Sequence, residues 1–254
     1  MWKVLQLQGQ RQYMEDRFIA NEGFFEDYDL YCVFDGHGGN VVADYCRENY
    51  AKFLYNELVE SQGDIGKSLY LSFLKIDNAI PITDSFVTGS TCLVVLKNTR
   101  TVWIANCGDS RAIISTQDKC MPLSEDHKPA EKEKERIEKL GGSVVQTEGG
   151  VWRVQGSLAM SRAIGDKHLR PFVIPQPEIY KIDINSKFKF ILLATDGLWD
   201  ILSNLEVSKI ILSVYDNPNL SDNEVLVHAN HKLLEHIYNK IEDNTTAILV
   251  HIRR

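Results

Sequence analysis

The chain has 254 residues, of which 44% are apolar and 25% are charged, an ordinary composition for a globular protein. Its formal net charge of −7 argues against a nucleic-acid binder, because a phosphate backbone is bound by a basic surface. No apolar run approaches the roughly 20 residues that cross a membrane, and the first residues lack the apolar core of a signal peptide. We therefore expect no nucleic-acid partner and no membrane association.

The first half of the chain is predicted to contain strands and two helices. Residues 17–20 and 29–34 are short, largely apolar stretches typical of strands. In residues 38–61 the apolar side chains recur at helical spacing, and a second helix is predicted over 65–80. Three strands separated by turn-like breaks follow at 89–97, 101–107 and 111–116.

The second half begins with a helix predicted over 128–142, with Pro129 near its start and two glycines at its end. The elements expected after it are strands at 178–184 and 187–195, helices around 205–215 and 222–239, and a last strand at 245–252. Runs of strands between groups of helices favour an α+β fold with antiparallel sheets over repeated βαβ units.

The cysteine content bears on the compartment. The number of cysteines is odd, they are scattered, and no two form a C-x-x-C pair. We expect reduced, mostly buried thiols and a cytoplasmic and/or nuclear location. The five are Cys32, Cys46, Cys92, Cys107 and Cys120.

Acidic residues stand at the ends of several predicted strands. Asp35 ends "LYCVF" and Asp109 follows "TVWIANCG". Asp196 follows "FILLAT", Asp200 comes four residues later, and Asp243 stands just before the last strand. Each acid alone is as easily a turn or cap residue, but five such positions favour a cluster. Clustered carboxylates need a neutralising cation, and oxygen-only ligands select hard ions such as Mg²⁺ or Mn²⁺.

Phosphate chemistry is suggested by that ion type, because octahedral divalent ions hold waters and phosphoryl oxygens. Arg11 is a candidate bidentate phosphate clamp, and Glu15 and Asp16 lie close enough in sequence to add metal or water ligands. No Cys-x5-Arg loop exists, and "GDIGKS" has two residues between its glycines where a P-loop needs four. A metal-activated water is then the simplest nucleophile.

Nine motifs in fixed order resemble the PP2C (PPM) family of metal-dependent serine/threonine phosphatases and run from residue 11 to residue 250. The resemblance implies one catalytic domain over residues 1–254, with a central β-sandwich of two antiparallel sheets flanked by helices on both faces. It also implies two Mg²⁺ or Mn²⁺ ions at one end of the sandwich, phosphoserine and phosphothreonine proteins as substrates, and a monomer. The motifs are "RQYMED", "VFDGHGG", "TGSTCLVV", "ANCGDSRAI", "LSEDHKP", "GSLAMSRAIGD", "PEI", "LLATDGLWD" and "DNTTAILV".

The resemblance implies metal-binding roles for five residues. Asp35 is expected to bridge the two metals, and the carbonyl of Gly36 to bind one of them. Asp196 and Asp243 are expected to complete the protein ligands of the other metal. Glu15 is expected to contact its metal directly or through water. A water between the metals would attack phosphorus in line, without a phosphoenzyme.

Five further roles come from the same resemblance. Arg11 is expected to hold the phosphoryl oxygens, and His37 to protonate the departing serine or threonine oxygen. Asp16 is expected to orient metal-bound water. Asp109 and Asp200 match the positions of a weaker third metal site.

Two other functions remain open from the sequence. One is a catalytically inactive binding module on the same fold, which should have lost some of these acids or Arg11, yet all are present. The other is a different two-metal hydrolase such as a nuclease, against which the acidic net charge counts.

Overall fold

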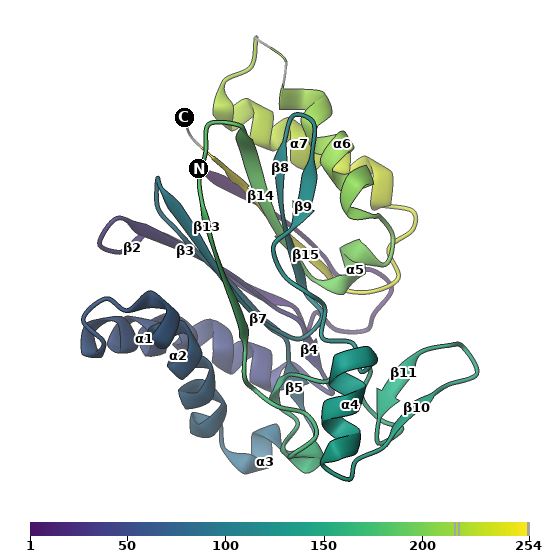
Figure 1. The fold of residues 1–254 in the computed structure, drawn as a ribbon. Coiled ribbons are helices and arrows are strands. Elements are labelled where there is room, and N and C mark those ends of the chain that lie inside the picture. The colour runs from purple at the N-terminus through teal and green to yellow at the C-terminus, as the bar shows by residue number, and fades with distance from the viewer. Residues whose placement is uncertain (216, 218, 253–254) are drawn as a thin grey trace.

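The fold is built on two antiparallel β-sheets stacked face to face (Figure 1). It is described from a computed structural model, for residues 1–215, 217 and 219–252. In that part of the chain the first sheet has five strands, in the order β1 (Trp2–Leu7), β15 (Thr245–His251), β14 (Phe188–Ala194), β8 (Arg111–Thr116) and β9 (Cys120–Pro122).

The second sheet is formed mainly by strands from the first half of the chain. Among the described residues its five strands stand in the order β13 (Glu178–Asp183), β7 (Thr101–Cys107), β6 (Cys92–Lys97), β3 (Tyr28–Phe34) and β2 (Arg17–Phe25). Helices α1 (Val41–Glu60) and α2 (Ile65–Ala79) cover its outer face, and α6 (Asn204–Tyr215) and α7 (Asp222–Ile237) cover the outer face of the first sheet (Figure 1). The predicted helix–sheet–sheet–helix fold is confirmed.

Strand β3 shows why the central strands are apolar on both faces. Leu30, Cys32 and Phe34 pack among the residues of α1 and α2. Tyr31 and Val33 alternate with them and pack between the sheets, against residues of β14 and β15. Because successive side chains of a strand point to opposite faces, a strand covered on both sides needs apolar residues at every position.

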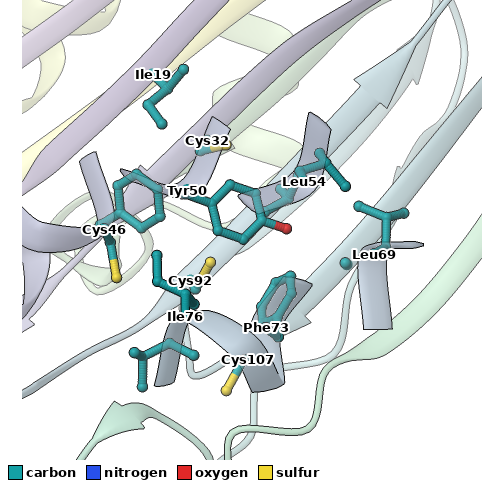
Figure 2. Packing of buried hydrophobic residues seen from close by; sticks show 14 of the residues in the cluster. Ile19, Cys32, Cys46, Tyr50, Leu54, Leu69, Phe73, Ile76, Cys92 and Cys107 are labelled. Atoms are coloured by element: carbon teal, nitrogen blue, oxygen red, sulfur yellow. The ribbon is translucent and has the colours of Figure 1, made fainter. Parts of the chain in front are cut away.

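The layer between the second sheet and its helices holds four of the five cysteines (Figure 2). Tyr50 of α1 and Phe73 of α2 meet edge to face there, with ring centroids 5.5 Å apart. The Tyr50 hydroxyl also lies 3.0 Å from the hydroxyl of Ser72. These four cysteines are therefore packing residues of this core, and the prediction of mostly buried thiols is confirmed.

Replacement of Phe73 by alanine is expected to lower the free energy of unfolding by about 3–5 kcal/mol, because it leaves a cavity in this layer. Phe73 is 0% exposed, whereas Tyr70 on the same helix is 40% exposed. Urea denaturation of both alanine variants checks the difference. Equal losses at the two positions would contradict the packing described here.

The structure adds elements that the sequence pattern did not reveal. Residues 2–7, for which no element was predicted, form strand β1, which pairs with β15 from Trp2↔Val250 to Leu7↔Thr245. The helix predicted over 128–142 is shorter: α4 covers Glu131–Lys139, because Gly141 adopts a left-handed φ of 83°. A hairpin of β10 (Val144–Gln146) and β11 (Trp152–Val154) follows it. None of the helices in the described part of the chain is long and apolar enough to span a membrane.

Candidate active site

A pocket of 590 Å³ collects nearly all of the predicted site residues. Asp16 is the exception, since it is fully buried behind the pocket and its carboxylate accepts a hydrogen bond of 2.8 Å from Thr195 Oγ1. The predicted residues that line the pocket are Arg11, Glu15, Asp35, Gly36, His37, Asp109, Asp196, Asp200 and Asp243.

Strand directions bring the acids of the second sheet together. Strands β3 and β7 are both antiparallel to β6, which lies between them, so they run parallel to each other. Their carboxyl ends therefore lie at the same edge, where β3 is followed by Asp35 and β7 by Gly108 and Asp109. The Asp35 amide donates a hydrogen bond of 3.0 Å to Thr91 Oγ1, which fixes this turn beside β6.

In the first sheet the end of β14 meets the start of β15. The Thr195 amide donates to the Thr246 carbonyl at 3.0 Å, which places Asp196 beside Asp243. Asn244 then ties the N-terminal segment to this edge, because its side-chain oxygen accepts a hydrogen bond of 2.7 Å from the Glu15 amide. Residues from both ends of the chain thus share one site.

The electrostatics of the pocket are those of crowded carboxylates. Burial raises the pKa of Asp35 well above its ordinary value, and the nearby charges of Asp16 and Asp196 raise it further. Burial also raises the pKa of Asp196 to about 7, with a further contribution from Asp109. Full ionisation of this cluster therefore requires cations.

Two of the acids are paired with basic side chains. Arg11 Nη2 lies 2.5 Å from Asp243 Oδ2, and Lys128 Nζ forms an ion pair with Asp109 Oδ2. Lys128 was not among the predicted site residues. It belongs to the motif "LSEDHKP", but nothing in its spacing connects it to Asp109.

The donor set fits hard divalent cations. It consists of carboxylate oxygens together with the Gly36 backbone, and the buried Asp109 Oδ1 has no hydrogen-bond partner. Within residues 1–215, 217 and 219–252, no three Asp, Glu, His or Cys side chains already stand close enough to hold an ion. Arg11 and Lys128 draw two of the acids toward themselves instead.

His37 is held by a buried acid that was not among the predicted site residues. Its Nε2 lies 2.6 Å from Oδ2 of Asp166, which is 1% exposed, while the buried Nδ1 has no hydrogen-bond partner. Burial lowers the pKa of His37, but the hydrogen bond and charge of Asp166 outweigh it, so that this pKa is raised. The pair leaves Nδ1 as the ring nitrogen without a hydrogen-bond partner.

A further part of the pocket wall comes from the β10–β11 hairpin and the loop after it. Trp152 and Arg153 of β11 and Met160 of that loop line the pocket, and none of them was predicted as a site residue. Lys134 Nζ lies 4.6 Å from the centroid of the Trp152 ring and holds it from the α4 side. The pocket therefore has one acidic wall and one largely apolar wall.

Solved structures with this architecture define the class. A protein described as a C. elegans sex determining protein superimposes with a TM-score of 0.87 at 25% identity, over 100% of this chain and 65% of that one. A serine-threonine phosphatase 2C from Toxoplasma gondii gives a TM-score of 0.79 at 21% identity, over 99% of this chain and 94% of that one. The fold is thus that of 2C-type phosphatases.

Sequence comparison places the chain within that class. Bovine "Protein phosphatase 1L" is 35% identical over 270 residues, which cover 98% of this chain and 72% of that protein. Arabidopsis thaliana "Protein phosphatase 2C 16" is 35% identical over 263 residues, which cover 83% of this chain and 50% of that relative. The chain therefore spans about half the length of some of its relatives. The family model described as Protein phosphatase 2C matches residues 2–245, and the chain belongs to that family.

Proposed function

We propose that this chain is a metal-dependent protein serine/threonine phosphatase that hydrolyses phosphoserine and phosphothreonine by direct attack of water. The observation that carries the proposal is the single pocket in which Arg11, His37 and carboxylates from both sheets meet. The family match over residues 2–245 supports one catalytic domain as well. Retention of every predicted acid, of Arg11 and of His37 favours an active enzyme over an inactive binding module.

The acidic wall would hold two Mg²⁺ or Mn²⁺ ions. Asp35, the Gly36 carbonyl, Asp196, Asp243 and Glu15 are the proposed protein ligands. When bound, the ions would supply a water of lowered pKa and neutralise charge on the phosphoryl group.

The residues outside this ligand set have supporting tasks. Asp109 and Asp200, with Asp196, form a weaker third metal position in this proposal. Asp16 is buried outside the pocket lining, where Thr195 donates a hydrogen bond to it and its charge acts on Asp35, and its proposed task is to hydrogen-bond metal-bound water.

Arg11 is the proposed phosphate-binding side chain. Its side chain is 59% exposed at the mouth of the pocket, and its present partner is Asp243. A guanidinium has several donors in a fixed plane, so it can bind two phosphoryl oxygens at once. A cation bound by Asp243 would release Arg11 from this pair to contact the substrate.

His37 is the proposed general acid. Asp166 holds its Nε2, so the proton available to the leaving oxygen is the one on Nδ1. The carboxylate also favours the imidazolium form, which is the form that can donate. Asp166 therefore acts as a positioning residue for His37.

Hydrolysis of a phosphothreonine peptide tests the proposed function. We expect phosphate release in the presence of Mn²⁺ or Mg²⁺ and none after treatment with EDTA. Turnover that persists without divalent ions would contradict the metal-dependent mechanism. Binding of the phosphopeptide in the presence of Mn²⁺ without turnover would instead favour the inactive module.

The pairing of His37 with Asp166 requires a glycine at position 89. A Cβ at Gly89 would lie 2.0 Å from Asp166 Oδ2 and 2.5 Å from His37 Nε2. We expect Gly89→Ala to separate the pair and lower kcat for a phosphopeptide by about 10- to 100-fold, the loss typical of a mispositioned catalytic group. Gly66→Ala is the matched control, since its Cβ would meet only ordinary contacts at 3.4 Å or more. Full activity of Gly89→Ala would rule out the positioning role.

A further inference from the structure

Lys128 is a cation placed inside the acidic pocket by the backbone around it. The His127 amide donates a hydrogen bond of 3.0 Å to the Gly108 carbonyl, which holds the loop before α4 next to the end of β7. The Gly108 amide and the Nδ1 of His127 lie 3.1 Å apart and close the same contact from the other side. Lys128 therefore follows directly after a fixed point, and its side chain is directed to Asp109.

The ion pair joins an accessible cation to a buried anion. The Lys128 side chain is 44% exposed, whereas that of Asp109 is 2% exposed. Asp109 Oδ2 is taken by the ammonium group, and Asp109 Oδ1 is buried without a hydrogen-bond partner. A buried carboxylate that is only half satisfied still has an oxygen to offer to a further cation.

The charge of Lys128 also reaches the two neighbouring acids. Burial raises the pKa values of Asp196 and Asp200, and Lys128 lowers both. All three carboxylates line the same pocket as the ammonium group. Lys128 is thus the counter-ion of this part of the cluster.

We infer that Lys128 is a built-in counter-ion for Asp109 that must leave before a divalent ion binds at Asp109, Asp196 and Asp200. This inference rests on the proposed function, because it concerns the weaker metal position of that site. Asp109 Oδ2 cannot pair closely with an ammonium group and a divalent ion at once, since the two cations repel each other. The long, rotatable lysine stem and its partial exposure provide a way out into solvent.

The competition has a consequence for metal affinity. In the proposed ligand set Asp109 belongs only to the third position, so ions at the two positions around Asp35 would not compete directly with Lys128 for Asp109, although the charge of Lys128 also reaches Asp196. An ion at the third position would have to displace Lys128 from Asp109. The apparent affinity of that position for a divalent ion is therefore reduced by the stability of the Lys128–Asp109 ion pair. Removal of the lysine charge should therefore tighten the weakest site selectively.

Calorimetric titration with Mn²⁺ tests this inference on the intact chain. We expect Lys128→Met, which retains length without charge, to tighten the weakest Mn²⁺ site by about tenfold or more. Lys128→Arg keeps the charge and should stay within about threefold of the parent protein. Unchanged or weaker binding at that site in Lys128→Met would overturn the inference.

A second variant locates the effect. In Lys128→Met combined with Asp109→Asn the gain in affinity should disappear, and its persistence would show that Lys128 acts elsewhere. If Lys128→Met does not fold, as judged by its thermal unfolding in EDTA, Lys128→Gln replaces it with the same expectation. These isotherms need no turnover. If Mn²⁺ binding depends on Lys128 but the chain does not hydrolyse phosphopeptides, the phosphatase proposal is refuted and the counter-ion inference stands. If the chain is active but Lys128→Met leaves the isotherms unchanged, the counter-ion inference is refuted and the phosphatase proposal stands.

Discussion

The Asp196→Asn variant is expected to lose at least about 100-fold in kcat/KM on a phosphopeptide with Mn²⁺, because the amide no longer carries the charge of a proposed metal ligand. The replacement preserves shape, so the turn from β14 into α5 (Asp196–Trp199) stays in place. Steady-state kinetics at several Mn²⁺ concentrations measures the loss. Partial recovery at high Mn²⁺ would identify the defect as one of metal binding.

Thermal unfolding in EDTA separates this loss from misfolding. Burial raises the pKa of Asp196 from 3.8 to about 7, so the folded metal-free protein binds a proton that the unfolded chain releases at lower pH. Its free energy of unfolding therefore falls as pH rises from about 4 to 7, and at pH 8 the buried ionised carboxylate destabilises the folded state. Asp196→Asn removes this destabilising charge, so the Tm of the variant at pH 8 in EDTA should equal or exceed that of the parent protein.

Asp183→Asn is the matched control, an exposed aspartate at the end of β13 in the other sheet. It should keep both its activity and its Tm. A large loss of activity in this control, or an active Asp196→Asn, would remove Asp196 from the proposed metal site.

The main elements of the fold could be predicted because their sequence signals are local. The long helices α1 and α2 show apolar residues at helical spacing and are followed shortly by Gly63 and Pro81, and the buried strands are continuous apolar runs. Strand β1 has the weaker pattern "WKVLQL" and is a strand because β15, more than 230 residues away, offers it an edge. Pairing of that kind is a tertiary effect that no local window contains.

The site residues also fall into those that could be predicted from local sequence and those that could not. Acids at strand ends could be identified because position along a strand is a local property. Their number favoured a cluster, and the family resemblance then implied the role of each. Lys128 and Asp166 could not be identified as site residues from the sequence, because each acts on a partner that only the fold brings close. Lys128 pairs with Asp109, and Asp166 pairs with His37. The hairpin that lines the pocket was not predicted either, because strands of only three residues leave too short a pattern in the sequence.

The His37→Ala variant is expected to show a loss that depends on the leaving group. A serine or threonine alkoxide leaves poorly unless it is protonated, and general acid catalysis contributes about 10²- to 10⁴-fold. We therefore expect kcat on a phosphoserine peptide to fall at least about 100-fold. With an aryl phosphate such as p-nitrophenyl phosphate, whose phenolate leaves without a proton, the loss should stay below about tenfold.

The ratio of the two losses is the decisive quantity, because damage to the metal site would lower both rates together. His231→Ala, at an exposed position on α7, is the control and should change neither rate. Asp166→Asn should shift the ratio in the same direction by a smaller amount, since an amide still contacts Nε2 but no longer stabilises the imidazolium. Equal losses on both substrates would assign His37 to the architecture of the pocket, and a different group would then have to donate the proton.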